Sequence, residues 1–139
     1  MKVLFVCRAN VGRSQAAMEL FRQVGGEADS AGTKVDLPGV TLAERPGVTI
    51  IGKVLLADYG IDISQNVRTQ ISLDFASNYD TLVVMAEKET VPNWLLNDSR
   101  TCYWKIDDPK GQDIMTTRRI VNEIKARVDS LATELKLAA

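Results

Sequence analysis

The chain has 139 residues, of which 45% are hydrophobic and 25% charged, values typical of one globular domain with one core. Its net charge of −1 provides no basic field for nucleic acid or an anionic membrane, and no apolar run is long enough to cross a bilayer. The sequence has no histidine and two cysteines, a poor set of zinc ligands, so we expect neither a metal nor a cofactor.

Strands alternate with helices along the chain. Apolar runs predict strands at residues 2–6, 27–31, 80–86 and 101–106, and periodic apolar positions predict helices at 14–24, 48–59, 88–97 and 113–135. Two Pro-Gly pairs predict a long loop at residues 33–47, and Gly60 is placed to end the second helix. This order predicts a parallel sheet with helices on both faces, a single three-layer α/β domain over residues 1–139.

The loop between the first strand and the first helix reads Cys, five residues, Arg, Ser, from Cys7 to Ser14. A loop of this length before a helix can turn its N–H groups inward as an anion nest, and the helix N-terminus adds free donors. Arg13 offers a planar fork for two oxygens, Gly12 permits a tight or positive-φ conformation, and Asn10 can adopt a left-handed one. The candidate anion-binding residues are therefore Arg8, Ala9, Asn10, Val11, Gly12 and Ser14.

Cys7 is the candidate nucleophile, because it lies at the carboxyl end of a strand, where α/β sheets bind their ligands. The helix N-terminus and Arg13 favour the thiolate, whose attack on phosphorus would give a phosphocysteine that Ser14 helps to release. The alternative is a small buried strand residue, a common place for a free cysteine. The short apolar run before Cys7 suits a strand better than a signal peptide, so we expect a cytoplasmic protein with free thiols.

Cys102 falls within the last predicted strand. We expect a core residue there, because free cysteines are among the most buried side chains. The alternative is a resolving thiol for Cys7. A disulfide between the two cysteines is disfavoured in the cytoplasm.

Three further segments complete a resemblance that covers nearly the whole chain. The loop from Cys7, the segments SAGT at 30–33 and YGIDIS at 59–64, and the pair Asp108-Pro109 occur in this order. Together they resemble the low-molecular-weight protein tyrosine phosphatases and the thioredoxin-linked arsenate reductases, which share a fold. The resemblance implies a four-stranded sheet ordered 2-1-3-4 and assigns Asp108 the general-acid role, with Asp107 as the competing choice.

The leading functional hypothesis is metal-independent hydrolysis of a phosphomonoester, phosphotyrosine in protein, by a monomer that binds phosphate-like oxyanions and neither nucleic acid nor membrane. Val11 resembles the apolar residue of tyrosine-specific members, but Lys110 and Gly111 stand where the family carries aromatic rings. Arsenate reduction with an external thiol is the alternative, because residues 75–100 lack the cysteines of a self-contained reductase. A catalytically silent phosphate-binding module is the third hypothesis.

Overall fold

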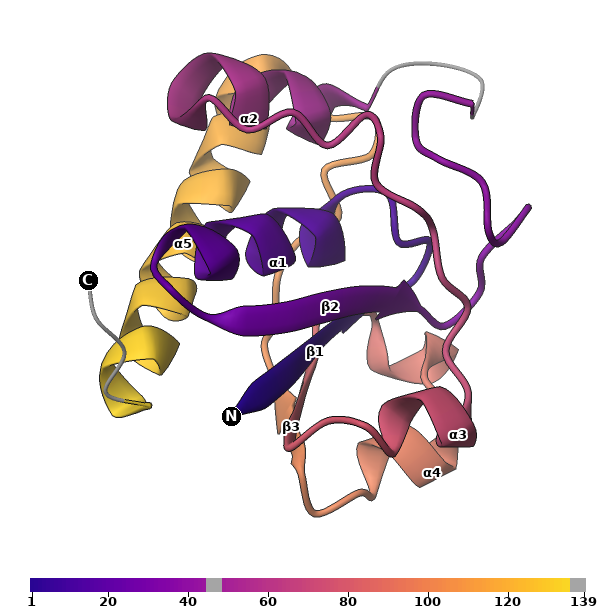
Figure 1. Ribbon diagram of the computed structural model, residues 1–139. Helices are drawn as coiled ribbons and strands as arrows, with labels where there is room; N and C mark the ends of the chain where they lie inside the picture. The colour runs from indigo at the N-terminus through magenta and orange to yellow at the C-terminus, as the bar shows by residue number, and fades with distance from the viewer. Residues whose placement is uncertain (45–48, 136–139) are drawn as a thin grey trace.

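The computed structural model of the protein describes residues 1–44 and 49–135. Its four strands form one parallel sheet in the order β2-β1-β3-β4, with helices on both sides (Figure 1), which confirms the predicted α/β fold and strand order. The strands are β1 Lys2–Cys7, β2 Glu27–Gly32, β3 Thr81–Val84 and β4 Thr101–Tyr103. The helices are α1 Arg13–Gln23, α2 Ile50–Tyr59, α3 Leu73–Ala76, the 3₁₀ helix η1 Lys88–Thr90, α4 Asn93–Leu96 and α5 Ile114–Glu134.

The central strand β1 divides the core in two. Val3 and Phe5 face the helices α1, α2 and α5, while Leu4 and Val6 face α3 and α4, as the two-residue period of a strand requires. All four side chains are fully buried. Both helical layers are visible on either side of the sheet in Figure 1. The uninterrupted apolar sequence of β1 is therefore explained by burial on both faces.

The predicted elements differ from the observed ones mainly at their ends. The single helix predicted at 88–97 is wrong: Val91 and Pro92 separate η1 from α4, because Pro92 has no N–H and instead caps α4 with an extended backbone. The short helix α3, which Ser72 caps through Phe75 N–H, was not predicted. Gly60 ends α2 with a φ of 68°, as expected. The predicted start of α2 at Val48 and the Pro46-Gly47 pair lie outside the described residues.

Cys102 is exposed, so the prediction of a core residue is wrong. It lies on β4, which is an edge strand of only three residues and is covered incompletely by α5. Cys102 aligns with Val83, which aligns with Phe5, two residues before Cys7 and two strands away. Strand spacing and rise then place the two cysteine Cα atoms roughly 12 Å apart. A disulfide needs less than about 7 Å, so Cys102 cannot bridge to Cys7 in this fold.

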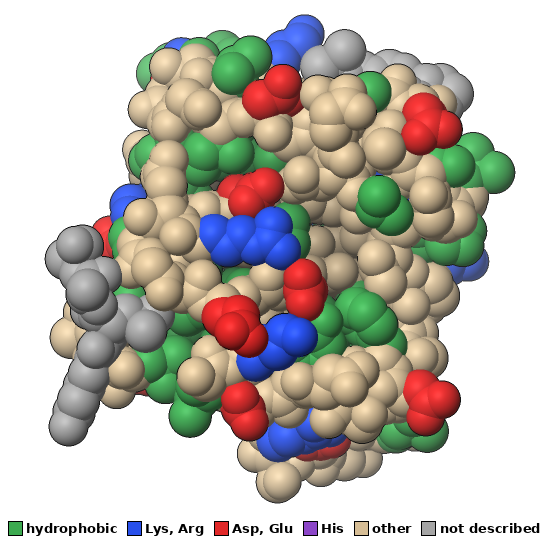
Figure 2. Space-filling model, viewed as in Figure 1, with side chains coloured by type: hydrophobic (Ala, Val, Ile, Leu, Met, Phe, Trp, Pro, Cys, Tyr) green, Lys and Arg blue, Asp and Glu red, His purple; other side chains and the backbone are tan. Residues whose placement is uncertain are grey.

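Charged side chains of both signs lie together in a central band on the face drawn in Figure 2. Ion pairs join Arg22 to Glu19 and Asp29, and Asp29 also contacts Lys2. Arg22 and Lys2 are thus paired with neighbouring carboxylates and do not form a free basic patch. Within the described residues, no helix combines the length and apolarity needed to cross a membrane.

Candidate active site

The loop between β1 and α1 has its carbonyl groups turned outward. Four consecutive carbonyls, from Cys7 to Asn10, each accept a hydrogen bond from a group outside the turn. The donors are Thr33 N (2.9 Å), Lys34 N (2.8 Å), Arg68 Nη2 (2.9 Å) and Gln15 Nε2 (3.2 Å), in that order. In a trans peptide the N–H points opposite to the carbonyl of the same group. The amides of residues 8 to 11 therefore turn toward the inside of the loop, as an anion nest requires.

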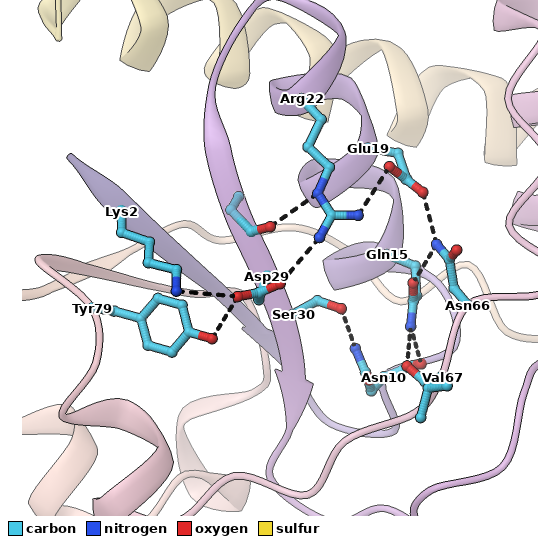
Figure 3. Close-up of polar contacts among 11 residues, drawn as sticks. Lys2, Asn10, Gln15, Glu19, Arg22, Asp29, Ser30, Asn66, Val67 and Tyr79 are labelled. Atoms are coloured by element: carbon cyan, nitrogen blue, oxygen red, sulfur yellow. Dashed lines mark hydrogen bonds and ion pairs between the residues drawn. The ribbon is translucent and has the colours of Figure 1, made fainter.

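Asn10 braces this loop from behind. Its φ of 57° confirms the expected left-handed conformation, and its side chain is fully buried. The side-chain nitrogen donates to Ser14 Oγ (2.8 Å) and Ser30 Oγ (2.9 Å), while the oxygen accepts from Thr69 N (2.8 Å). Figure 3 shows the contact with Ser30 on β2. The loop is thereby tied to the strand beside it and to the segment that precedes α3.

Gly12 has a backbone conformation outside the common helix and strand regions, with a ψ of −87°, which glycine adopts more readily than other residues. Its φ is −134°, so the positive φ considered from the sequence is not found. A Cβ atom at this position would lie 3.2 Å from Ile51 Cγ2, closer than most such contacts. Gly12 also caps α1 without a side-chain hydrogen bond, and the first turn of α1 carries no acidic residue. The free amides and positive end of the helix dipole remain available to an anion.

Cys7 lies at the base of the loop and is buried, with 3% of the residue exposed. Its Sγ atom is 3.0 Å from Ser14 Oγ. Because Asn10 donates to that same Oγ, the hydroxyl hydrogen of Ser14 is available to the sulfur. The arrangement can stabilise a negative charge on Cys7, the form in which a cysteine acts as a nucleophile.

Arg13 is anchored at one end of its guanidinium group. Nη1 donates to Met85 O (2.9 Å), Ile106 O (3.0 Å) and Glu87 Oε2 (2.9 Å), and Nη2 donates to Glu87 Oε1 at 3.3 Å. Of the five N–H donors, the Nε–H and one Nη2–H remain, and these lie on one edge of the group. That edge is a fork suited to two oxygens of a tetrahedral anion.

Charge reinforces this anchoring. Burial by itself would lower the pKa of Arg13, but the hydrogen bond to Glu87 and the charges of Cys7, Glu87 and Asp108 outweigh it and raise that pKa. Burial would likewise raise the pKa of Glu87, yet its hydrogen bond with Arg13 holds that pKa below the ordinary value. Both groups are therefore charged at neutral pH.

The two candidate acids point in different directions. Asp108 Oδ2 lies 3.9 Å from Arg13 Nη2, and Asp108 Oδ1 accepts from Lys110 N at 3.0 Å. Asp107 instead approaches Arg119 on α5, at 3.7 Å, with a side chain that is 66% exposed. Only Asp108 lines the pocket above the loop.

That pocket has a volume of about 500 Å³. The side chains of Asn10 and Ser14 do not line it but hold the loop from the opposite side. Among the described residues, none of the lining side chains is aromatic; Val11, Ile50 and Pro109 supply apolar surface, and the exposed Arg8 and Lys110 supply positive charge. The lining residues are Cys7, Arg8, Ala9, Val11, Gly12, Arg13, Thr49, Ile50, Ile51, Asp108, Pro109, Lys110, Gly111 and Gln112.

Three residues of this site were not found from the sequence: Gln15, Arg68 and Glu87. Glu87 follows the predicted strand 80–86. Because α/β sheets bind ligands at the carboxyl ends of their strands, its position could have indicated a role in the site, as that of Cys7 did. Gln15 is buried on α1 and donates to the carbonyls of Asn10 and Val67 (Figure 3). Nothing in the sequence pattern distinguishes Gln15 or Arg68 from surface polar residues.

Comparison with known proteins agrees with the fold. The family model described as low molecular weight phosphotyrosine protein phosphatase matches residues 2–138. The chain belongs to this family, as the resemblance of its motifs predicted. The solved low molecular weight protein tyrosine phosphatase from T. tengcongensis superposes with a TM-score of 0.78 at 24% identity, covering 96% of this chain and 99% of that one.

Several similar proteins carry a different name. A glutaredoxin arsenate reductase from Synechocystis sp. is 29% identical over 136 residues, covering 96% of this chain and 98% of the relative. Arsenate reductase 1 from Staphylococcus epidermidis is 28% identical, and the match covers 94% of each. A solved arsenate reductase in the phosphate binding state has a TM-score of 0.76 at 26% identity, covering 96% of this chain and 97% of that one.

Proposed function

We propose that this protein hydrolyses phosphomonoesters, phosphotyrosine in protein being the substrate class, without a metal ion. The observation that supports this proposal most strongly is the geometry of the loop that follows Cys7. Its four carbonyl groups are held outward by hydrogen bonds, and Cys7 lies in a pocket that Arg13 and Asp108 also line. The inward amides and the free edge of Arg13 would bind three phosphoryl oxygens. Val11, Ile50 and Pro109 would contact the aryl group. A free nucleophilic thiol requires a reducing compartment, which favours the cytoplasm.

The reaction would proceed in two displacements. The Cys7 thiolate attacks phosphorus, the bond to the ester oxygen breaks, and the protonated carboxyl of Asp108 gives its proton to that leaving oxygen. Water then attacks the phosphocysteine, Asp108 takes a proton from the water, and the thiolate leaves while inorganic phosphate is released. The Ser14 hydroxyl, 3.0 Å from the sulfur, would stabilise the departing thiolate.

Phosphate, vanadate and arsenate should all compete with an aryl phosphate substrate. Arg13→Lys should weaken the binding of all three anions by about tenfold or more. An ammonium is a point charge and cannot reproduce the planar fork that Glu87 and two carbonyls orient. Inhibition constants would be measured with and without EDTA, which should change nothing. Arg118→Lys is the matched control, because Arg118 pairs with Asp58 at 2.9 Å, away from the pocket. Equal inhibition constants for the Arg13 variant and the wild type would refute the clamp role.

Arsenate reduction is the second candidate, favoured by the arsenate reductase names of similar proteins and by the lack of an aromatic wall among the described lining residues. Cys7 would attack arsenic(V), and two electrons must then come from thiols as a disulfide forms and arsenic(III) leaves. Cys102 lies too far from Cys7 to serve as the second thiol. A reductase of this sequence would therefore need an external thiol, such as glutathione with glutaredoxin.

Aryl phosphate hydrolysis and arsenate reduction, assayed on one preparation, separate these two functions. We expect hydrolysis without added thiol, and no arsenate turnover with thioredoxin alone, since no second cysteine can reach Cys7. The Cys102→Ser variant should match the wild type in both assays. Thioredoxin-dependent arsenate reduction that disappears in this variant, with negligible phosphatase activity, would overturn the proposal.

A further inference from the structure

We infer that Arg68 is a positioning residue for the anion-binding loop, acting through the carbonyl of Ala9. The inference rests on the proposed anion-binding function of that loop. Arg68 precedes α3 in the chain, and its side chain is fully buried behind the loop, outside the pocket. Nη2 donates to Ala9 O at 2.9 Å, and the group also contacts Asp36 through the backbone oxygen and one carboxylate oxygen, each at 2.6 Å.

The Ala9 carbonyl controls the direction of one amide of the nest. The peptide group that carries this carbonyl also carries the N–H of Asn10, and the two point in opposite directions. Holding the carbonyl toward Arg68 therefore holds the Asn10 N–H toward the pocket side. Asn10 has a φ of 57°, a sparsely populated region for residues other than glycine, so this peptide needs external support.

Arg68 differs from the other three carbonyl partners in its charge. Backbone amides hold the carbonyls of Cys7 and Arg8, and a neutral side-chain amide holds that of Asn10. A guanidinium donor makes a stronger bond. It also polarises the peptide group, which makes the Asn10 N–H a better donor to an anion.

Stability alone does not explain a guanidinium at this place. Its side chain is inaccessible to solvent, and the Nε–H is buried without a hydrogen-bond partner. Burial of a charge and of an unpaired donor both oppose folding, and buried ion pairs are often replaced by apolar residues without loss of stability. A role in directing the loop accounts for the position of the group and for its contact with Ala9.

Arg100 provides a matched control. Its guanidinium also donates to two backbone carbonyls, those of Ala76 and Tyr79, and pairs with a nearby aspartate, Asp98, at 2.8 Å. These contacts lie near the amino-terminal end of β3, whereas the loop lies at the carboxyl ends of the strands. Arg100→Met should therefore lower stability as a structural arginine does, without changing the loop.

The test compares the dissociation constant for inorganic phosphate in the wild type, Arg68→Met and Arg100→Met, by calorimetry on folded protein. We expect Arg68→Met to weaken binding by about tenfold or more, the scale of one lost charge-assisted hydrogen bond, and Arg100→Met to change it less than about twofold. The ¹H–¹⁵N signal of Asn10 should shift on phosphate addition in the wild type and respond far less in Arg68→Met. A folded Arg68→Met variant with wild-type affinity and a wild-type Asn10 response would overturn the inference.

Arg68→Lys keeps the inference testable should the methionine variant fail to fold. One ammonium cannot bind Ala9 O together with the backbone oxygen and Oδ1 of Asp36 as the planar guanidinium does. The affinity for phosphate should therefore fall by about threefold or more. Unchanged phosphate affinity in this variant would contradict the positioning role of Arg68 but would leave the proposed function of the loop standing. A wild-type protein that neither binds phosphate nor hydrolyses aryl phosphate would refute the proposed function and this inference together.

Discussion

Replacing Cys7 with serine is expected to abolish aryl phosphate hydrolysis while leaving the fold and phosphate binding intact. The substitution removes the thiolate but little volume, and Ser14 at 3.0 Å can hydrogen-bond a hydroxyl as it does the sulfur. Loss of a covalent nucleophile lowers turnover by roughly 10⁴-fold or more. Turnover is measured with a chromogenic aryl phosphate, and phosphate affinity by calorimetry on the same samples.

Phosphate binding that survives the substitution would show that hydrolysis is lost with the nucleophile and not with the fold. The proposed anion-binding site consists of backbone amides and Arg13, none of which the substitution changes, so the dissociation constant for phosphate should stay within a few-fold of the wild-type value. Cys102→Ser is the control for a thiol lost elsewhere and should hydrolyse substrate at the wild-type rate, because Cys102 is exposed on the edge strand. Substantial residual turnover in Cys7→Ser would exclude a phosphocysteine mechanism.

The sequence predicts the sheet well because its signal is local. An apolar run such as Leu82 to Met85 can only be a strand or a buried helix, and its length and flanking polar residues favour the strand. The prediction fails where tertiary structure sets the outcome. Cys102 has the sequence neighbourhood of a core strand, but β4 lies at the sheet edge, and nothing in the sequence states how far α5 covers it.

The same distinction applies to the candidate site. Cys7 and Arg13 were recognisable because both belong to one short loop at a strand end. The groups that orient them come from distant parts of the chain: Glu87 is 74 residues from Arg13, and Arg68 is 59 residues from Ala9. A single sequence carries no record of such contacts. They follow only from the crossovers that bring loops 33–41, 64–71 and 85–87 beside the first loop.

The choice between Asp107 and Asp108 could not be made from spacing, since both follow the last strand. In the structure, Asp108 lies 3.9 Å from Arg13 at the pocket, whereas Asp107 contacts Arg119 outside it. A bound dianion would occupy the free edge of Arg13 and displace the Asp108 carboxylate from it. Asp108 would then be free to face the leaving oxygen as the proposed proton donor.

Asp108→Asn should therefore slow hydrolysis far more than Asp107→Asn. General acids contribute about 10²–10⁴-fold, so we expect a loss of that size in turnover of phenyl phosphate for Asp108→Asn. Asp107→Asn removes one exposed ion pair at 3.7 Å and should stay within about twofold, because such pairs contribute little. The deficit of Asp108→Asn should shrink with nitrophenyl phosphate, whose leaving oxygen needs less protonation. An equal deficit for both leaving groups would show that Asp108 acts on binding or structure, and a reversed ranking of the two variants would assign the proton donor to Asp107.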